Sequence, residues 1–155
     1  MSSIFRKYLM IFLFSMIPVA ELRAAIPMGI AWDLNPILTY LVCVVGNMIP
    51  VPFILLCIRA IFKWMRKRGG TLEKIVLFME RKANKNAEML YKYKLLGLFI
   101  LVAIPLPGTG AWTGSLVSAM LQMPVKTSTW VIALGVLAAG VAVLAISCGV
   151  GAIFA

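Results

Sequence analysis

The amino-acid sequence predicts an all-α integral membrane protein made of two inverted repeats, each a re-entrant helical hairpin followed by a transmembrane helix. Hydrophobic residues make up 63% of the chain and charged residues only 13%, which excludes an ordinary soluble domain. Four long apolar stretches are present, and two of them are broken at matching positions, near Pro18 and Pro105. We expect one membrane domain over 1–155, divided into repeat one (1–62), a basic cytoplasmic amphipathic connector (63–94) and repeat two (95–155).

The first apolar stretch runs from Tyr8 to Trp32 and is interrupted in its middle by Pro18, Glu21 and Arg23. About ten apolar residues precede this break, and ten helical residues reach only about 15 Å, half the thickness of the hydrocarbon core. Proline removes a backbone donor and disfavours helix in the residue before it. We therefore expect two half-helices that enter and leave by the same face, with Pro18 and Pro27 at the re-entrant tip.

The second apolar stretch, from Leu34 to Phe62, is long enough to cross a membrane completely. It contains a proline kink at 49–52 and the polar residue Asn47, which we expect to satisfy backbone groups freed by Pro50. Near its end, Arg59 is expected to extend its side chain to the membrane interface.

The connector is strongly basic, since ten of the fifteen Lys and Arg residues lie between Lys63 and Lys94. Basic residues in a short loop between membrane segments mark the cytoplasmic side and favour contact with anionic lipid headgroups. We therefore exclude nucleic acid as a partner despite the net charge of +10. Apolar residues at helical spacing predict an amphipathic surface helix over 71–94.

The third apolar stretch, from Leu95 to Met123, is broken like the first stretch, and its break lies 87 positions later in the sequence. We expect Pro105, Pro107 and Gly114 at its tip. The fourth, from Val125 to Ala155, is rich in glycine and alanine, which let membrane helices approach closely. We expect this small-residue face to form a homodimer or a higher oligomer.

The crossings predict a multi-pass protein of the inner (cytoplasmic) membrane with both termini outside. The competing topology has four complete crossings and both termini inside, which the basic residues Arg6 and Lys7 mildly favour.

Glu21 and Arg23 are the only charged residues of the first apolar stretch and should lie near the middle of the membrane. An ionisable residue there costs at least about 2.5 to 3.5 kcal/mol, so it normally has a partner or faces a water-filled cavity. We expect Glu21 to couple transport to protons and Arg23 to bind an anionic group. The structural alternative is a buried ion pair that holds the hairpin.

The second tip opens a half-helix whose free amide groups and positive dipole end favour an anion. Its candidate binding residues are Gly108, Thr109, Gly110 and Thr113, and the alternative is a tight membrane turn. Secondary candidates are Asn47, Arg59, Trp112 and Gln122. There is no His, no carboxylate pair and no Ser nucleophile with a base, so we expect no catalytic residue, no metal site and no cofactor.

Two motifs, at 21–27 and 104–114, resemble those of the small multidrug export protein family, which is distantly similar to the DedA/VTT superfamily. The resemblance covers nearly the whole chain and implies two facing re-entrant loops in a proton-linked transporter or lipid translocase. The second tip departs from DedA proteins, which carry arginines where this chain has Gly108, Thr109 and Gly110.

These patterns together predict a DedA-like, proton-coupled membrane transporter or a lipid flippase or scramblase. Its expected substrate is an anionic amphiphile such as a polyprenyl phosphate or a phospholipid, and its expected partners are membrane lipids and protons. One alternative is a proton-coupled exporter of small drugs or cations. A second is a membrane scaffold that transports nothing.

Overall fold

The computed structural model describes residues 3–154, except for 69, 71–73, 75–76, 79–86 and 107–108. Every regular element among the described residues is an α-helix, which confirms the all-α prediction for that part of the chain. The helices are α1 (Ser3–Met16), α2 (Glu21–Ala31), α3 (Pro36–Met48), α4 (Pro50–Arg68), α6 (Ala87–Ala103), α7 (Ala111–Met120) and α8 (Val125–Phe154). Within this part of the chain, two helical stretches are long and apolar enough to cross a membrane, Pro36–Lys67 and Val125–Gly149.

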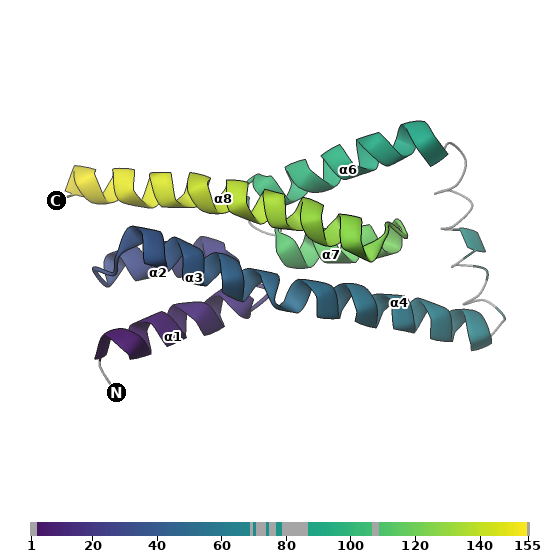
Figure 1. The fold of residues 1–155 in the computed structure, drawn as a ribbon, viewed down its shortest axis with the longest axis horizontal. Helices are drawn as coiled ribbons and strands as arrows, with labels where there is room; N and C mark the ends of the chain where they lie inside the picture. Colours follow the sequence, from purple (N-terminus) through teal and green to yellow (C-terminus); the bar gives the residue numbers. More distant parts are fainter. Residues whose placement is uncertain are drawn as a thin grey trace.

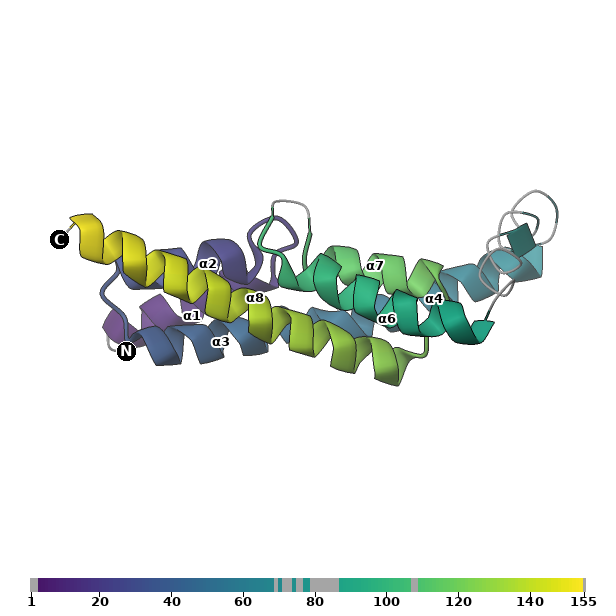
Figure 2. The ribbon, with the colours of Figure 1, turned by 90° about the horizontal axis from the view of Figure 1, so that it is seen from above.

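The two short-helix hairpins point in opposite directions along the molecule (Figure 1). Helices α1 and α2 form one hairpin and α6 and α7 form the other, and the turns of both lie at mid-length. The long stretch α3–α4 and the long helix α8 run past both hairpins in opposite senses, so the two chain termini lie at the same end. Viewed from above, the two turns lie side by side on one face (Figure 2). We call them tip one (17–20) and tip two (104–110).

Equivalent contacts recur in the two halves of the chain. A Cβ on Gly46 of α3 would lie 2.8 Å from the carbonyl oxygen of Phe12 in α1. A Cβ on Gly135 of α8 would lie 3.2 Å from the carbonyl oxygen of Phe99 in α6. In each half, therefore, a glycine lets the long helix pack directly on the backbone of the first hairpin helix.

The ends of α2 and α7 are also equivalent. Asp33 and Gln122, 89 positions apart, both adopt a left-handed backbone, with φ of 56° and 53°. In each turn the following amide donates to a carbonyl five residues earlier, that of Gly29 or of Ser118, at 3.1 Å. This is the hydrogen-bond pattern that closes a helix when one residue turns left-handed, and it reverses the chain into the long helix.

The long helices differ in one respect. Asn35 caps the start of α3 by accepting hydrogen bonds from two backbone amides, with Pro36 at the first helical position. The helix then breaks at Ile49, where Pro50 begins α4. Helix α8 continues through the corresponding region without a break.

The small residues of α8 are largely used inside the chain. Gly135 faces Val102 of α6, and a Cβ there would lie 2.7 Å from the Cβ of Val102. Gly140 faces the ring of Tyr40 on α3, and a Cβ there would lie 2.6 Å from the nearest ring carbon. Gly149, by contrast, is exposed and has nothing within 4 Å of a Cβ, so the oligomer interface expected on the small-residue face of α8 stays a proposal.

The expected amphipathic helix over 71–94 falls largely outside the described residues. Helix α4 extends to Arg68, beyond the boundary expected at 62, and α6 begins at Ala87, before the boundary expected at 95. The sequence boundaries followed the change from apolar to basic residues, whereas the helices continue past that change because basic residues are themselves good helix formers.

We predict that Gly135→Ala destabilises the protein whereas Gly149→Ala, in the same helix, does not. The methyl group at 135 would collide with Val102, and such overpacking costs about 1–3 kcal/mol. Nothing lies within 4 Å of a Cβ at 149, so the better helix propensity of alanine is the main effect there. Thermal unfolding of both purified variants in mild detergent measures the difference, and equal melting temperatures would contradict this packing.

Candidate binding site between the hairpin tips

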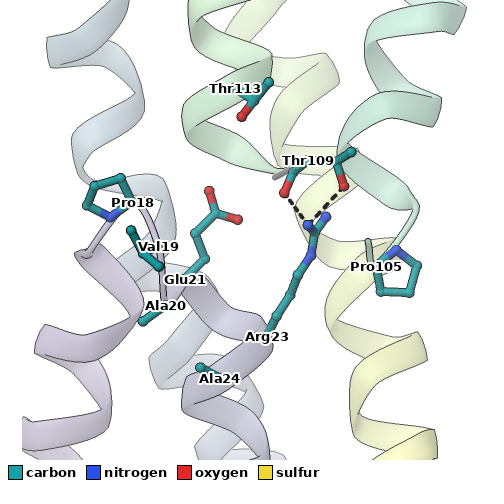
Figure 3. A pocket seen from close by; sticks show the side chains of 9 residues that line it. All are labelled: Pro18, Val19, Ala20, Glu21, Arg23, Ala24, Pro105, Thr109 and Thr113. Atoms are coloured by element: carbon teal, nitrogen blue, oxygen red, sulfur yellow. Dashed lines mark hydrogen bonds between the residues drawn. The ribbon is translucent and has the colours of Figure 1, made fainter. Parts of the chain in front are cut away.

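A pocket of about 310 Å³ lies between the two tips (Figure 3). Its walls are apolar or small on the side of tip one and carry hydroxyl groups on the side of tip two and α7. The lining residues are Pro18, Val19, Ala20, Glu21, Arg23, Ala24, Pro105, Thr109 and Thr113.

The guanidinium group of Arg23, on α2, binds the main chain at the end of α6 and in tip two. Its Nη2 donates to the carbonyls of Val102 at 3.2 Å and Ile104 at 2.8 Å. Its Nη1 donates to Oγ1 of Thr109 at 2.9 Å and to the carbonyls of Leu106 and Thr109. The last carbonyls of a helix have no partner within it and carry its negative dipole end, so a cation there is favourable. Arg23 therefore caps the end of α6.

Glu21 makes the complementary contact at the start of α7. Its side chain is 5% exposed, and its Oε1 accepts a hydrogen bond from the backbone amide of Trp112 at 3.2 Å. The first amides of a helix lack partners and form its positive end, which favours a carboxylate. Gly110 permits this approach, because any Cβ there would overlap the carboxylate and because its φ is 145°.

One further contact joins the two hairpins. The indole Nε1 of Trp112 donates to the carbonyl of Met16, at the end of α1, at 3.1 Å. Within tip two, the hydroxyl of Thr109 lies 2.9 Å from the carbonyl oxygens of both Ile104 and Leu106 and shares its one hydrogen between them. The hairpins therefore bind each other in both directions, through Glu21 and Arg23 of α2 and through Trp112 of α7.

The predicted site residues do gather in one place. Glu21, Arg23, Thr109 and Thr113 line the pocket, and Gly110 lies against the carboxylate. Both charged side chains extend from α2 toward the opposite hairpin, where Glu21 accepts from the backbone amide of Trp112 at the start of α7 and Arg23 donates to Thr109 in tip two (Figure 3). The roles assigned to these residues, in proton coupling and in anion binding, remain predictions.

The expected tip residues divide into three groups. Pro18 and Pro105 lie at the tips and line the pocket. Pro107 and Gly108 fall outside the described residues. Pro27 and Gly114 were wrongly placed at the tips, since they lie inside α2 and α7 respectively.

The two misplaced residues have physical reasons for their positions. A membrane helix tolerates a proline such as Pro27 because neighbouring helices can satisfy the freed backbone group. Gly114 is buried, and a Cβ there would lie 2.5 Å from Val102, so glycine lets α7 pack on α6.

The secondary candidates have separate environments. Arg59 on α4 donates to the carbonyl of Met123 in the turn before α8, so it binds main chain rather than reaching only for an interface. Gln122 forms the left-handed turn after α7. Asn47 is buried and neither of its side-chain polar atoms has a hydrogen-bond partner, so the expected bond to freed backbone is not formed.

One polar contact escaped the sequence reasoning. Lys7 on α1 donates to the carbonyl of Trp32 at 3.0 Å, at the end of the helix that follows tip one. Its acceptor is a main-chain carbonyl, which every residue carries, so no residue type marked it in advance.

A family model described as "Putative small multi-drug export protein" matches residues 21–142, from Glu21 through both tips and into α8. No curated protein and no solved structure matches the chain.

We predict that Arg23→Met lowers the free energy of unfolding by about 2–4 kcal/mol, because it leaves the carbonyls at the end of α6 without their charged donor. The unfolding free energy of Arg23→Lys should lie between those of the wild type and Arg23→Met, since an ammonium group retains the charge but not the planar fork of the guanidinium. SDS-induced unfolding in mixed micelles measures these differences. The control Arg6→Met removes an exposed arginine of α1 and should change little, and an equal loss there would contradict the capping role.

Proposed function

Because the chain belongs to the family of small multi-drug export proteins, we propose that it is a membrane exporter whose substrate passes through the pocket between the hairpin tips. The observation that carries this proposal is the position of Glu21. It is a buried carboxylate in the wall of a pocket at mid-length of a molecule with two apolar stretches long enough to span a membrane. An ionisable residue at that depth is by default a functional group.

Proton exchange at Glu21 supplies a mechanism for export. A cationic amphiphile and a proton would compete for one carboxylate, so each turn of the cycle would move one against the other. The inward proton gradient would then drive the cation outward. The apolar side chains on the wall of tip one suit the hydrocarbon part of such a substrate. In this scheme Arg23 holds tip two, since its nitrogens already donate to main-chain carbonyls.

A second candidate is the translocation of an anionic amphiphile, such as a polyprenyl phosphate or a phospholipid. It is favoured by the guanidinium of Arg23 and the amide end of α7, which meet at the same pocket and could bind a phosphate. Protonation of Glu21 would release the backbone amides at the start of α7. An anion could then enter the pocket and bind those amides. Anion and proton would then move in the same direction, so this candidate predicts the opposite coupling.

For the membrane we propose that both hairpins are re-entrant and that Pro36–Lys67 and Val125–Gly149 span the bilayer. The two termini lie at the same end of the molecule, as an even number of crossings requires (Figure 1). The basic connector would then face the cytoplasm and both termini the outside of the inner membrane.

We also propose that the tips are covered by a second copy of the chain. Val19 in tip one is 94% exposed, and residues 17–20 there do not form a regular α-helix. Irregular backbone at membrane depth is tolerated only against protein or water, and a homo-oligomer would provide the protein.

We predict that Glu21→Gln abolishes proton-driven transport in proteoliposomes. When the vesicle interior is acidic, protons flow outward. Wild-type protein should then take up ethidium, a cationic amphiphile, in exchange for these protons, because both bind the same carboxylate. Glu21→Asp retains the carboxylate and should keep part of this uptake. A fluorescent anionic phospholipid, followed by dithionite quenching, tests the second candidate in the same vesicles. Uptake of ethidium by Glu21→Gln at the wild-type rate would refute proton exchange at this residue.

We predict that compartment-specific reporters fused separately at Met1 and Ala155 both report the outside of the cell. This result follows from two spanning stretches and two re-entrant hairpins, with a cytoplasmic connector. Reporters that both show the inside would instead indicate four complete crossings and would contradict the proposed topology.

A further inference from the structure

Asn47 is a buried polar residue that the proposed function does not use. Its side chain is 1% exposed, and neither Oδ1 nor Nδ2 has a hydrogen-bond partner in the structure. A buried polar group without a partner is destabilising, so such a group in a native protein needs an explanation, of which a bound ion is one.

The backbone beside Asn47 offers further oxygen atoms. Asn47 lies in the last turn of α3, just before the break at Ile49. The carbonyls of Gly46 and Met48 would normally receive hydrogen bonds from the amides four residues later, but those positions are Pro50 and Pro52. Proline has no N–H, so neither carbonyl receives its helical bond. One amide oxygen and two carbonyl oxygens without helical partners therefore occur within three consecutive residues.

The other half of the chain lacks this arrangement. Gly46 and Gly135 occupy equivalent places against the first hairpin helices, so Asn47 corresponds to Val136. Helix α8 is unbroken there, and Val136 is buried among apolar residues. An apolar residue in a continuous helix thus serves the packing in repeat two. The polar residue and the break in repeat one are not required by that packing.

We propose that the break between α3 and α4 binds a monovalent alkali cation, with Na⁺ as the probe, through Asn47 Oδ1 and the carbonyls of Gly46 and Met48. Hard cations take oxygen ligands, and broken membrane helices offer unwound carbonyls to Na⁺. These three ligands are neutral, which suits a single charge. A water molecule on the cation would accept a hydrogen bond from Nδ2. The break lies at the same mid-length level as the hairpin tips (Figure 1).

The test is the thermal unfolding of the full-length protein in mild detergent, in NaCl and in choline chloride at equal ionic strength. A ligand that binds only the folded state shifts the folding equilibrium by about elevenfold when present at ten times its Kd. We predict a saturable rise in melting temperature of about 3–6 °C in Na⁺. Equal melting in the two salts would overturn the proposal, since a water molecule would then account for Asn47.

Two variants in α3 make the test specific. Asn47→Val copies repeat two and should lose the Na⁺ response while melting in choline chloride at or above the wild-type temperature. Thr39→Val is the matched control, because the Thr39 hydroxyl is also buried without a partner but is remote from the break. It should keep the full Na⁺ response. A Na⁺ response retained by Asn47→Val would refute the site.

Two more variants keep the result interpretable. If Asn47→Val does not fold, Asn47→Asp keeps an oxygen ligand and adds a charge, so it should reach half-saturation at a lower Na⁺ concentration, and an unchanged midpoint would count against the proposal. Glu21→Gln should retain the Na⁺ response, since the cation site stands apart from the tip pocket. Loss of transport in that variant and loss of the Na⁺ response in Asn47→Val are therefore separate findings.

Discussion

A helix that ends in apolar surroundings exposes backbone groups that need hydrogen-bond partners from elsewhere in the protein, because the surroundings offer none. The centre of this molecule contains such helix ends. Helix α6 ends at tip two and α7 begins there. Arg23 supplies donors to the carbonyls of the first and Glu21 supplies an acceptor to the amides of the second. Both side chains come from the first turn of α2, so one short helix completes the opposite hairpin. The relative position of the two halves follows from this exchange.

The same physical solution recurs away from the centre. Lys7 binds the carbonyl of Trp32 at the end of α2, and Arg59 binds that of Met123 after α7. In each case a cation from one helix reaches the carbonyl end of another, where the helix dipole favours positive charge. Lys7, Glu21, Arg23 and Arg59 therefore each bind main-chain groups at or next to the end of another helix. Such contacts explain how these four charged side chains are accommodated in so apolar a chain.

The sequence predicted the breaks and the charged residues better than it predicted their partners. Proline at 18 and 105 marks each tip because its effect on the backbone is local. Glu21 and Arg23 stood out because charge is rare in apolar stretches. Their partners are mainly main-chain groups, whose positions depend on the whole fold and not on residue type. The oligomer interface expected from the glycines of α8 stays a prediction. Gly135 and Gly140 pack against helices of the same chain, because close packing within a chain favours the same small residues as packing between chains.

The repeat is regular up to the tips and slips there by two positions. Phe12 and Phe99 are 87 residues apart, whereas Gly46 and Gly135 are 89 apart, so tip two is the longer turn. In a protein with two identical inverted repeats, exchanging the conformations of the halves would give a second state of equal free energy, related to the first by a two-fold rotation. A longer loop in one half and a broken helix in the other remove that equality here. A difference of about 1.4 kcal/mol between two such states would hold ten molecules in one for each in the other.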